Sequence, residues 1–194
     1  MSTTEHFQPA LPSRPKRADA RRNYDKVIAA AREAFNERGA STSLEDIARR
    51  AGVGIGTLYR HFPSRQALIE AVYVNEVEQL AQTAVGLEEL EPWEALVAWL
   101  RRFVGYLSTK QALAHELLEY IDRDAPLFRE CRALMYGGGE PLLRRAQSAG
   151  AVRADTDIAQ VTHMVMGIAR IPASDPDDVA HILDIALDGL RFRG

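Results

Sequence analysis

The sequence predicts an all-α protein with nine helices in two domains, and three of its features support this. Apolar residues recur at spacings of three and four over most of the 194 residues, which is the period of a helix with one buried face. Sustained apolar–polar alternation and the Asn-Gly turn of a hairpin are both absent. Glycine and proline divide the chain at the intervals expected of helix ends, and 46% hydrophobic residues suffice for a packed core.

Composition excludes several classes of protein. Apolar runs stay below the roughly 18 residues that span a bilayer, and residues 1–15 lack the apolar segment of a secretory signal. The single cysteine, Cys131, cannot form an internal disulfide, as expected in a reducing compartment. We therefore expect a cytoplasmic protein without membrane contact.

The charge is unevenly distributed. Residues 1–66 carry 12 Lys or Arg against 7 Asp or Glu, net +5, whereas residues 67–194 carry 12 against 20, net −8. A basic segment is typical of proteins that bind a polyanion such as nucleic acid, and the alternative is chance clustering of solvated charges. Within it, Arg14, Lys16 and Arg17 either reach a DNA groove or only keep the chain soluble.

Three parts are expected along the chain. Residues 1–17 contain three prolines and few core-forming side chains, which predicts a disordered basic arm. Residues 18–63 are expected to form a small three-helix domain, and residues 64–194 a larger helical one. The expected helices are about 18–38, 43–51, 55–61, 64–86, 92–108, 111–121, 124–149 with an interruption at the triple glycine 137–139 and Pro141, 156–171 and 175–192.

Residues 42–65 are the most informative segment. A short helix after Ser43, whose hydroxyl can cap the free amides, is followed by a tight turn at 52–54 and a second short helix. Two helices joined by a glycine-containing turn form a helix-turn-helix, which places its second helix in the DNA major groove. Small Ala48 and Ala51 suit the crossing of the two helices.

The leading residues of that second helix are expected to face base edges. They are Gly54, Ile55, Gly56 and Thr57. The two glycines let the backbone approach the duplex, Thr57 can hydrogen-bond a base or touch a thymine methyl group, and Ile55 offers apolar contact only. Thr42 and Ser43 stand at the start of the preceding helix, where free amides and the helix dipole attract phosphate.

The run LYRHFPSR at residues 58–65 is the most specific motif in the sequence. Together with FNERG at 35–39 and SLEDIA at 43–48, it makes residues 22–75 resemble the tetracycline-repressor (TetR) family of bacterial regulators. Residues 92–171 resemble the SbtR-like subgroup of that family's ligand domains. The resemblance implies a DNA-binding domain, a ligand-binding and dimerisation domain, and a cytoplasmic, nucleoid-associated location in bacteria.

The resemblance also implies phosphate contacts. Tyr59 and His61 occupy the family's usual phosphate-contact positions, and Arg65 occupies its basic position at the start of the next helix. Many members have serine where Gly54 stands and a polar or basic residue where Ile55 stands, so the family does not supply the operator sequence. The alternatives are that Tyr59 packs on the first helix and that His61 is a solvated surface residue.

The second domain is expected to bind a small-molecule effector. Ligand pockets between helices are mostly apolar and aromatic with few polar groups, and the helix expected at 92–108 carries an aromatic edge. The alternative for each candidate is ordinary core packing, and the triple glycine is either a pocket entrance or a surface loop. The candidate pocket residues are Trp99, Phe103, Tyr106, His115, Cys131, Met135, His163, Met166 and Arg170.

Two motifs that suggest catalysis are incomplete. His115 begins a pattern like H-E-x-x-H, but Glu119 stands where the second zinc-binding histidine is needed. Cys131 has no evident base to activate it as a nucleophile. We therefore expect no catalytic residue, no metal site, no cofactor and no enzymatic activity.

The last two expected helices, at 156–171 and 175–192, carry apolar stripes wide enough for both the monomer core and a partner. In the resembled family these helices form a four-helix bundle across a two-fold axis, which implies a homodimer. The hypothesis is therefore a repressor that binds a palindromic double-stranded DNA operator and is released by a small molecule. The alternatives are an activator or multi-site DNA binder of the same fold, a small helical enzyme, and a protein-interaction bundle.

Overall fold

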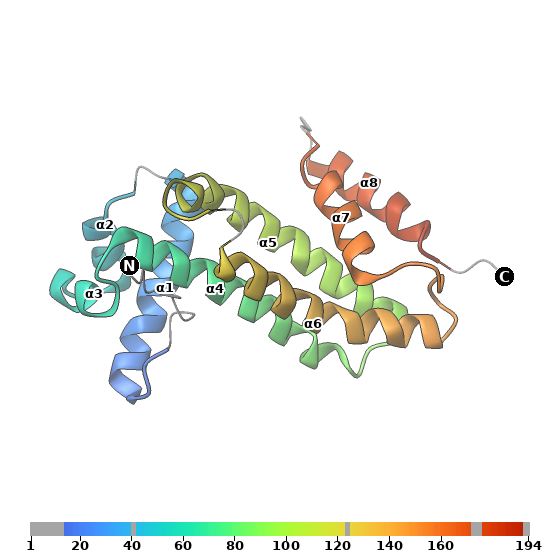
Figure 1. Cartoon of the computed structure of the whole chain (residues 1–194), viewed down its shortest axis with the longest axis horizontal. Helices are drawn as coiled ribbons and strands as arrows, with labels where there is room; N and C mark the ends of the chain where they lie inside the picture. The colour runs from blue at the N-terminus through green and yellow to red at the C-terminus, as the bar shows by residue number, and fades with distance from the viewer. Residues whose placement is uncertain (1–13, 40–41, 123–124, 172–175, 192–194) are drawn as a thin grey trace, which may run out of the picture. The chain divides into compact units, whose positions relative to one another are not determined.

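The computed structural model describes residues 14–39, 42–122, 125–171 and 176–191, and this part of the chain is helical, with one isolated bridge between Val152 and Arg191. The prediction of an all-α protein is thus confirmed. The helices are α1 (Ala18–Arg38), α2 (Leu44–Ala51), α3 (Ile55–His61), α4 (Arg65–Thr83), the short 3-10 helix η2 (Val85–Leu87), α5 (Pro92–Tyr120), α6 (Pro126–Ser148), α7 (Ile158–Ile168) and α8 (Pro176–Asp188) (Figure 1).

In the described residues the α-helices number eight rather than nine, because α5 joins two helices that the sequence separates. The expected break follows Ser108, where the sequence continues with threonine, lysine and glutamine. Such residues cost a helix at most about 0.7 kcal/mol each. That cost is too small to end a helix whose buried side chains, Phe103 before the break and Leu113 after it, both pack in a core.

The expected interruption of α6 at residues 137–139 is also wrong, since the helix runs unbroken through the three glycines and Pro141. Close packing gives two of the glycines a role. A Cβ built on Gly139 would lie 2.5 Å from Cη2 of Trp99 and 2.9 Å from Cδ1 of Ile158. The glycine therefore admits the indole ring against the backbone of α6, and the segment is not a surface loop.

Gly138 makes a second close approach. A Cβ on this residue would lie 2.8 Å from the Cα of Ala81 in α4, a distance that real side chains do not reach. By contrast, a Cβ on Gly137 would meet nothing within 4 Å. Two of the three glycines are thus required by neighbouring helices, and the third is not.

Contacts divide the chain into two compact units, one made of residues 1–75 and 109–131 and the other of residues 76–108 and 132–194. In the first unit α1 packs on α2 and α3. Its core is formed by side chains that are almost completely buried, among them Val27, Ile28, Ala31, Phe35, Ile47, Leu58 and Phe62.

Trp99 lies at the centre of the second unit and is fully buried. Its indole N–H donates to the carbonyl of Leu80, 3.2 Å away, in the last turn of α4. Carbonyls at the end of a helix lack helical partners. The N–H of Ala84, which would bond to the carbonyl of Leu80 if the helix continued, bonds to the carbonyl of Ala81. The tryptophan therefore supplies the missing donor to a buried acceptor.

Several helix ends differ from the prediction by a few residues. α4 ends at Thr83, and Gly86 falls in η2. α7 begins later than expected because Asp157 and Gln160 form a reciprocal capping box in front of it. The last helix is expected to start at residue 175, which lies outside the described residues. Among the described residues, no helix is long and apolar enough to cross a membrane.

The packing at Gly139 makes a stability prediction. Gly139→Ala should lower the free energy of unfolding by about 1–3 kcal/mol, because the added methyl group overpacks the buried indole. The matched Gly137→Ala, in the same helix but facing open space, should raise it by up to about 1 kcal/mol through helix propensity. Urea titration followed by circular dichroism measures both, and equal effects of the two substitutions would contradict the packing role.

Candidate nucleic-acid interface

Local hydrogen bonds shape the helix-turn-helix. The hydroxyl of Ser43 accepts a bond from the N–H of Asp46 at 3.1 Å and so caps α2. α2 ends at Gly52, whose φ of 65° is left-handed and whose N–H bonds back to the carbonyl of Ala48. This backbone conformation explains why the turn requires glycine. α3 starts soon afterwards, with Gly54 as its N-cap.

Two side chains anchor α3 from behind. Leu58 and Phe62 are buried, and the ring of Phe62 lies with its centroid 4.9 Å from that of Tyr24 in α1. His61 is half-buried, and its ring meets Tyr24 edge-on at 6.1 Å. One side of the seven-residue helix is therefore fixed to α1, which leaves the other side in solvent.

The residues expected to face DNA lie on that free side. Ile55 is 38% exposed and Tyr59 45% exposed, and Gly54 and Gly56 are exposed as well. Thr57 is half-buried. Tyr59 does not pack into the core of this unit, so its aromatic ring and hydroxyl are available to a partner.

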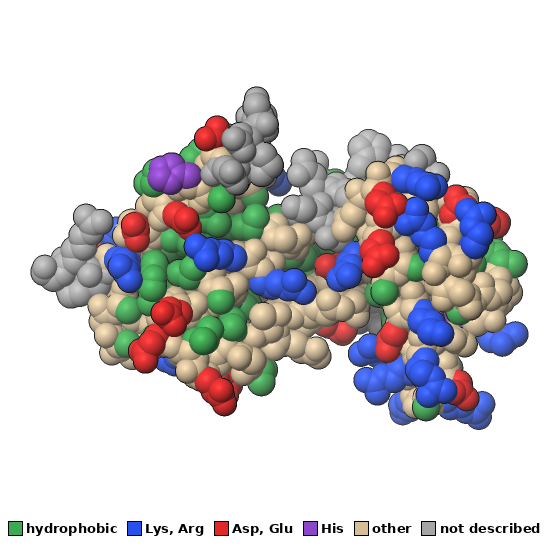
Figure 2. Space-filling model, turned by 180° about the vertical axis from the view of Figure 1, so that it is seen from behind, with side chains coloured by type: hydrophobic (Ala, Val, Ile, Leu, Met, Phe, Trp, Pro, Cys, Tyr) green, Lys and Arg blue, Asp and Glu red, His purple; other side chains and the backbone are tan. Residues whose placement is uncertain are grey.

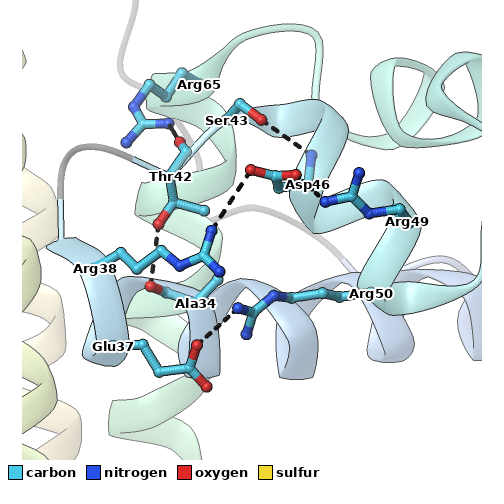
Figure 3. Close-up of polar contacts among 9 residues, drawn as sticks. All are labelled: Ala34, Glu37, Arg38, Thr42, Ser43, Asp46, Arg49, Arg50 and Arg65. Atoms are coloured by element: carbon cyan, nitrogen blue, oxygen red, sulfur yellow. Dashed lines mark hydrogen bonds and ion pairs between the residues drawn. The ribbon is translucent and has the colours of Figure 1, made fainter.

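Thr42 and Arg65 are placed differently from the expectation of phosphate contacts. Thr42 is buried, and its hydroxyl donates to the carbonyl of Ala34 in α1 at 3.0 Å. The carbonyl of Thr42 accepts a hydrogen bond from the guanidinium of Arg65 (Figure 3). That guanidinium also lies over the ring of Phe35, 5.3 Å from its centroid. Both residues thus attach the start of α2 to α1 and to the first residue of α4.

Ion pairs form a second link between α1 and α2. Glu37 pairs with Arg50 at 2.7 Å, and Arg38 approaches Asp46 at 3.8 Å, while Asp46 also pairs with Arg49 (Figure 3). The hydrogen bond from Arg50 lowers the pKa of Glu37, and the same bond raises the pKa of Arg50. These pairs are exposed, so they orient α2 more than they stabilise it. The two pairs between α1 and α2 leave no local sequence pattern, because their partners lie in different helices.

Three of the effector candidates form one aromatic row. The rings of Trp99 and Phe103 stack with centroids 5.9 Å apart, and Phe103 stacks on Tyr106 at the same distance. All three are buried in the second unit, as is Met135. In this structure the row is packed core.

The other candidates do not join the row. Cys131 is buried but belongs to the first unit, His163 and Arg170 are exposed, and Met166 is half-buried. The side chain of His115 lies outside the described residues. The candidate set is therefore dispersed.

The second unit also has an open surface hollow that the sequence analysis did not predict. It has a volume of about 830 Å³ and combines the segment after α6 with the end of α8. No local sequence pattern indicates this hollow, because its lining comes from two segments that are distant in the chain. The lining residues are Arg153, Ala154, Asp155, Ile185, Asp188, Gly189 and Arg191.

Two family models match the chain. Residues 27–72 match the model of bacterial regulatory proteins of the tetR family, and residues 91–192 match that of the C-terminal domain of SbtR-like transcriptional regulators. The second match alone spans more than half of the chain. Both agree with the resemblance inferred from the sequence.

The chain is also similar to solved structures and to relatives that are transcriptional regulators. The crystal structure of a TetR transcriptional regulator from Streptomyces coelicolor is 42% identical with a TM-score of 0.78, covering 88% of this chain and 99% of that one. A TetR transcription regulatory protein from Mycobacterium vanbaalenii is 35% identical with a TM-score of 0.75, covering 91% and 99%. The HTH-type transcriptional regulator UidR of Escherichia coli is 25% identical over 173 residues, which are 86% of this chain and 88% of that protein.

These matches cover the helix-turn-helix and the C-terminal half of the chain, and the relatives they identify are regulators rather than enzymes. The chain belongs to the TetR family of DNA-binding transcriptional regulators and carries an SbtR-like C-terminal domain.

Proposed function

We propose that this protein represses transcription by binding, as a homodimer, a palindromic operator in double-stranded DNA, and that a small-molecule effector releases it. The observation that carries the proposal is the exposed side of α3, with Ile55 and Tyr59 in solvent while Leu58 and Phe62 anchor the helix behind. A short helix held in this way fits a major groove about 12 Å wide. Repression follows because the bound dimer occludes the promoter.

The leading end of α3 reads the bases in this proposal. Gly54 and Gly56 allow the backbone to lie close to the duplex, and Ile55 makes apolar contact with a thymine methyl group. Thr57 is the hydrogen-bonding side chain of the set. The readout therefore combines shape and methyl contacts with few polar bonds.

Phosphate contacts fix the position of α3 on the duplex. Ser43, Tyr59 and His61 make these contacts directly, with the free amides at the start of α2. Thr42 and Arg65 contribute by holding that first turn in place, since their polar groups are used inside the unit. Their role in DNA binding is thus one of positioning.

The remaining functions follow the expected domain division. Residues 18–63 bind DNA behind the arm at 1–17, and residues 64–194 bind the effector and a second protomer. The effector opens the apolar region beside the row of Trp99 and Phe103, and it favours a conformer in which α4 holds the two α3 helices at the wrong separation. A coupling of about 1–3 kcal/mol is typical of such switches.

Dimerisation is assigned to α7 and α8. In α8, Leu183 and Leu187 are buried in the monomer, whereas Ile182 and Ile185 remain exposed, the latter by 60%. Two such faces related by a two-fold axis would bury each other. The two α3 helices must then lie about 34–36 Å apart to read successive turns of the major groove.

The experiment is selection of duplexes from a random pool by the full-length protein, followed by footprinting and a promoter reporter. A single palindromic consensus and a reporter silenced by the protein are expected. Many weak sites without symmetry would instead favour a multi-site binder, and an induced reporter would favour an activator. A compound that raises the melting temperature must also lower the affinity for the selected duplex, and unchanged affinity would reject it as the effector.

Thr57→Ala should change base preference at one position in each half-site, because it removes the hydrogen-bonding group and the methyl group together. A lost specific contact corresponds to about 1–3 kcal/mol of discrimination. Thr57→Val keeps a methyl group and separates the two contributions. Selection from the pool measures the preference, and an unaltered consensus with both variants would remove Thr57 from the readout.

Tyr59→Phe should weaken binding of the dimer to every sequence about thirtyfold, since it removes two hydrogen bonds to phosphate that are worth about 1 kcal/mol each. The consensus should stay the same. Tyr120→Phe, at an exposed tyrosine outside the helix-turn-helix, is the control and should bind normally. Fluorescence anisotropy with selected and scrambled duplexes measures both, and a change confined to the selected duplex would show that Tyr59 reads bases.

Arg65→Gln should destabilise the protein by about 1–2 kcal/mol, because it removes a charge-assisted hydrogen bond and a cation–π contact. DNA affinity should fall while its salt dependence stays that of the wild type. A phosphate-contacting arginine would behave in the opposite way, with normal stability and a shallower salt dependence. Thermal denaturation and binding at four salt concentrations distinguish these roles.

Ile185→Asp should convert the dimer into a monomer and abolish tight operator binding, because it places a carboxylate in the proposed apolar contact. Val85→Asp, at an exposed apolar residue in η2, is the matched control and should remain dimeric. Analytical ultracentrifugation reads the result, and an Ile185→Asp protein that stays dimeric would place the interface elsewhere.

A further inference from the structure

α1 extends well beyond the core that it helps to form. Its first buried residue is Tyr24, although the helix starts at Ala18, so six residues precede the first packed side chain. At 1.5 Å per residue these six span about 9 Å. None of these six residues is fully buried, so the extension adds little to the core, which makes its surface chemistry informative.

The start of α1 carries basic residues, whereas the rest of its core-facing side is apolar. Arg21 precedes Tyr24 by three residues and continues the face of α1 that carries Tyr24, Ile28 and Phe35, and Arg17 is the N-cap residue directly before the helix. Both arginines are exposed. Figure 2 shows Lys and Arg side chains gathered at the projecting end of α1, at the lower right.

This basic face adjoins α3. Tyr24 contacts His61, the last residue of α3, as well as Phe62. Arg21 therefore lies one turn of α1, and Arg17 about two turns, before the tyrosine that contacts the end of the proposed recognition helix. The exposed side of α3 and the basic end of α1 are neighbouring parts of one unit.

Nearby carboxylates are engaged with other cations. Asp25 pairs with Arg14 at 2.6 Å, and Asp19 pairs with Arg22. Within the described residues, neither Arg17 nor Arg21 forms an ion pair. Among the described residues nothing neutralises these two charges, so a polyanion beside α3 would meet them.

We propose that Arg17 and Arg21 bind phosphates of the DNA backbone next to the bases that α3 reads, and so extend the contact beyond the helix-turn-helix. The inference rests on the proposed placement of α3 in the major groove. Guanidinium groups suit phosphate because they donate in a bidentate manner and keep their charge. Such contacts are independent of sequence, and they add affinity through release of counterions.

The test uses full-length Arg17→Gln/Arg21→Gln protein with the duplex selected from the random pool. A dimer would lose four phosphate contacts, so the slope of log affinity against log salt should become about three to four units shallower, with affinity roughly tenfold or more weaker at about 0.1 M salt. Phosphate-ethylation interference should disappear at the phosphates these arginines touch and persist at the others. Arg17→Lys/Arg21→Lys should restore most of the slope.

Lys26→Gln is the matched control. It removes one positive charge from the same helix, but Lys26 is exposed five residues after Arg21 and points about 140° away from it around the helix. Its slope and interference map should be those of the wild type. The proposal would be overturned if the Arg17→Gln/Arg21→Gln protein had the salt slope of the wild type. It would also be overturned if Lys26→Gln made the slope as much shallower per removed charge as the double variant does.

The same measurements distinguish failure of the Arg17 and Arg21 contacts from failure of the proposed placement of α3 in the major groove. If wild-type protein selects no consensus and ethylation interferes nowhere, the placement of α3 itself is wrong. If the consensus and central interference persist while the double variant changes nothing, only the role of Arg17 and Arg21 fails. Because both residues are exposed, the melting temperature should be unchanged, which checks that lost binding is not lost folding.

Discussion

The buried hydroxyl of Thr42 and the carbonyl beside it hold the helix-turn-helix in its position. The hydroxyl reaches back to α1 at Ala34, and the carbonyl receives the guanidinium of Arg65 at the start of α4. α2 has only eight residues, which is too short to be stable alone. Its orientation therefore depends on tertiary contacts at its first turn. The tight turn at Gly52 connects α2 to α3, so the orientation of α3 depends on the same contacts.

A comparable constraint orders the second unit. The indole of Trp99 is fixed by its bond to Leu80, and the missing side chain at Gly139 admits the ring against α6. Proline at position 141 removes a hydrogen-bond donor from the same helix, yet α6 continues. The packing on both sides outweighs the poor helix propensity of the segment, which is why its glycines do not act as a hinge in this structure.

Features that depend on neighbours in sequence were predictable, and features that depend on distant neighbours were not. The cap at Ser43 and the tight turn at residues 52–54 follow from local spacing, and both appear as predicted. The meaning of the triple glycine depends on Trp99, some 40 residues earlier, and no pattern within 137–141 reveals it. Arg65 likewise has its partner 23 residues away, so the family motif suggested a phosphate contact where the structure has an internal bond.

The chemistry of the recognition helix explains why backbone contacts should matter in this protein. Two glycines and an isoleucine lead α3, so Thr57 alone among the four offers a hydrogen-bonding side chain to the bases. Specific base contacts contribute about 1–3 kcal/mol each, and a reader with few of them gains little affinity from the bases. The rest must come from phosphates, whose contribution grows with the number of cations presented to them. A helix that projects past its own core, with two arginines at its start that form no ion pair among the described residues, meets that requirement without adding any sequence specificity.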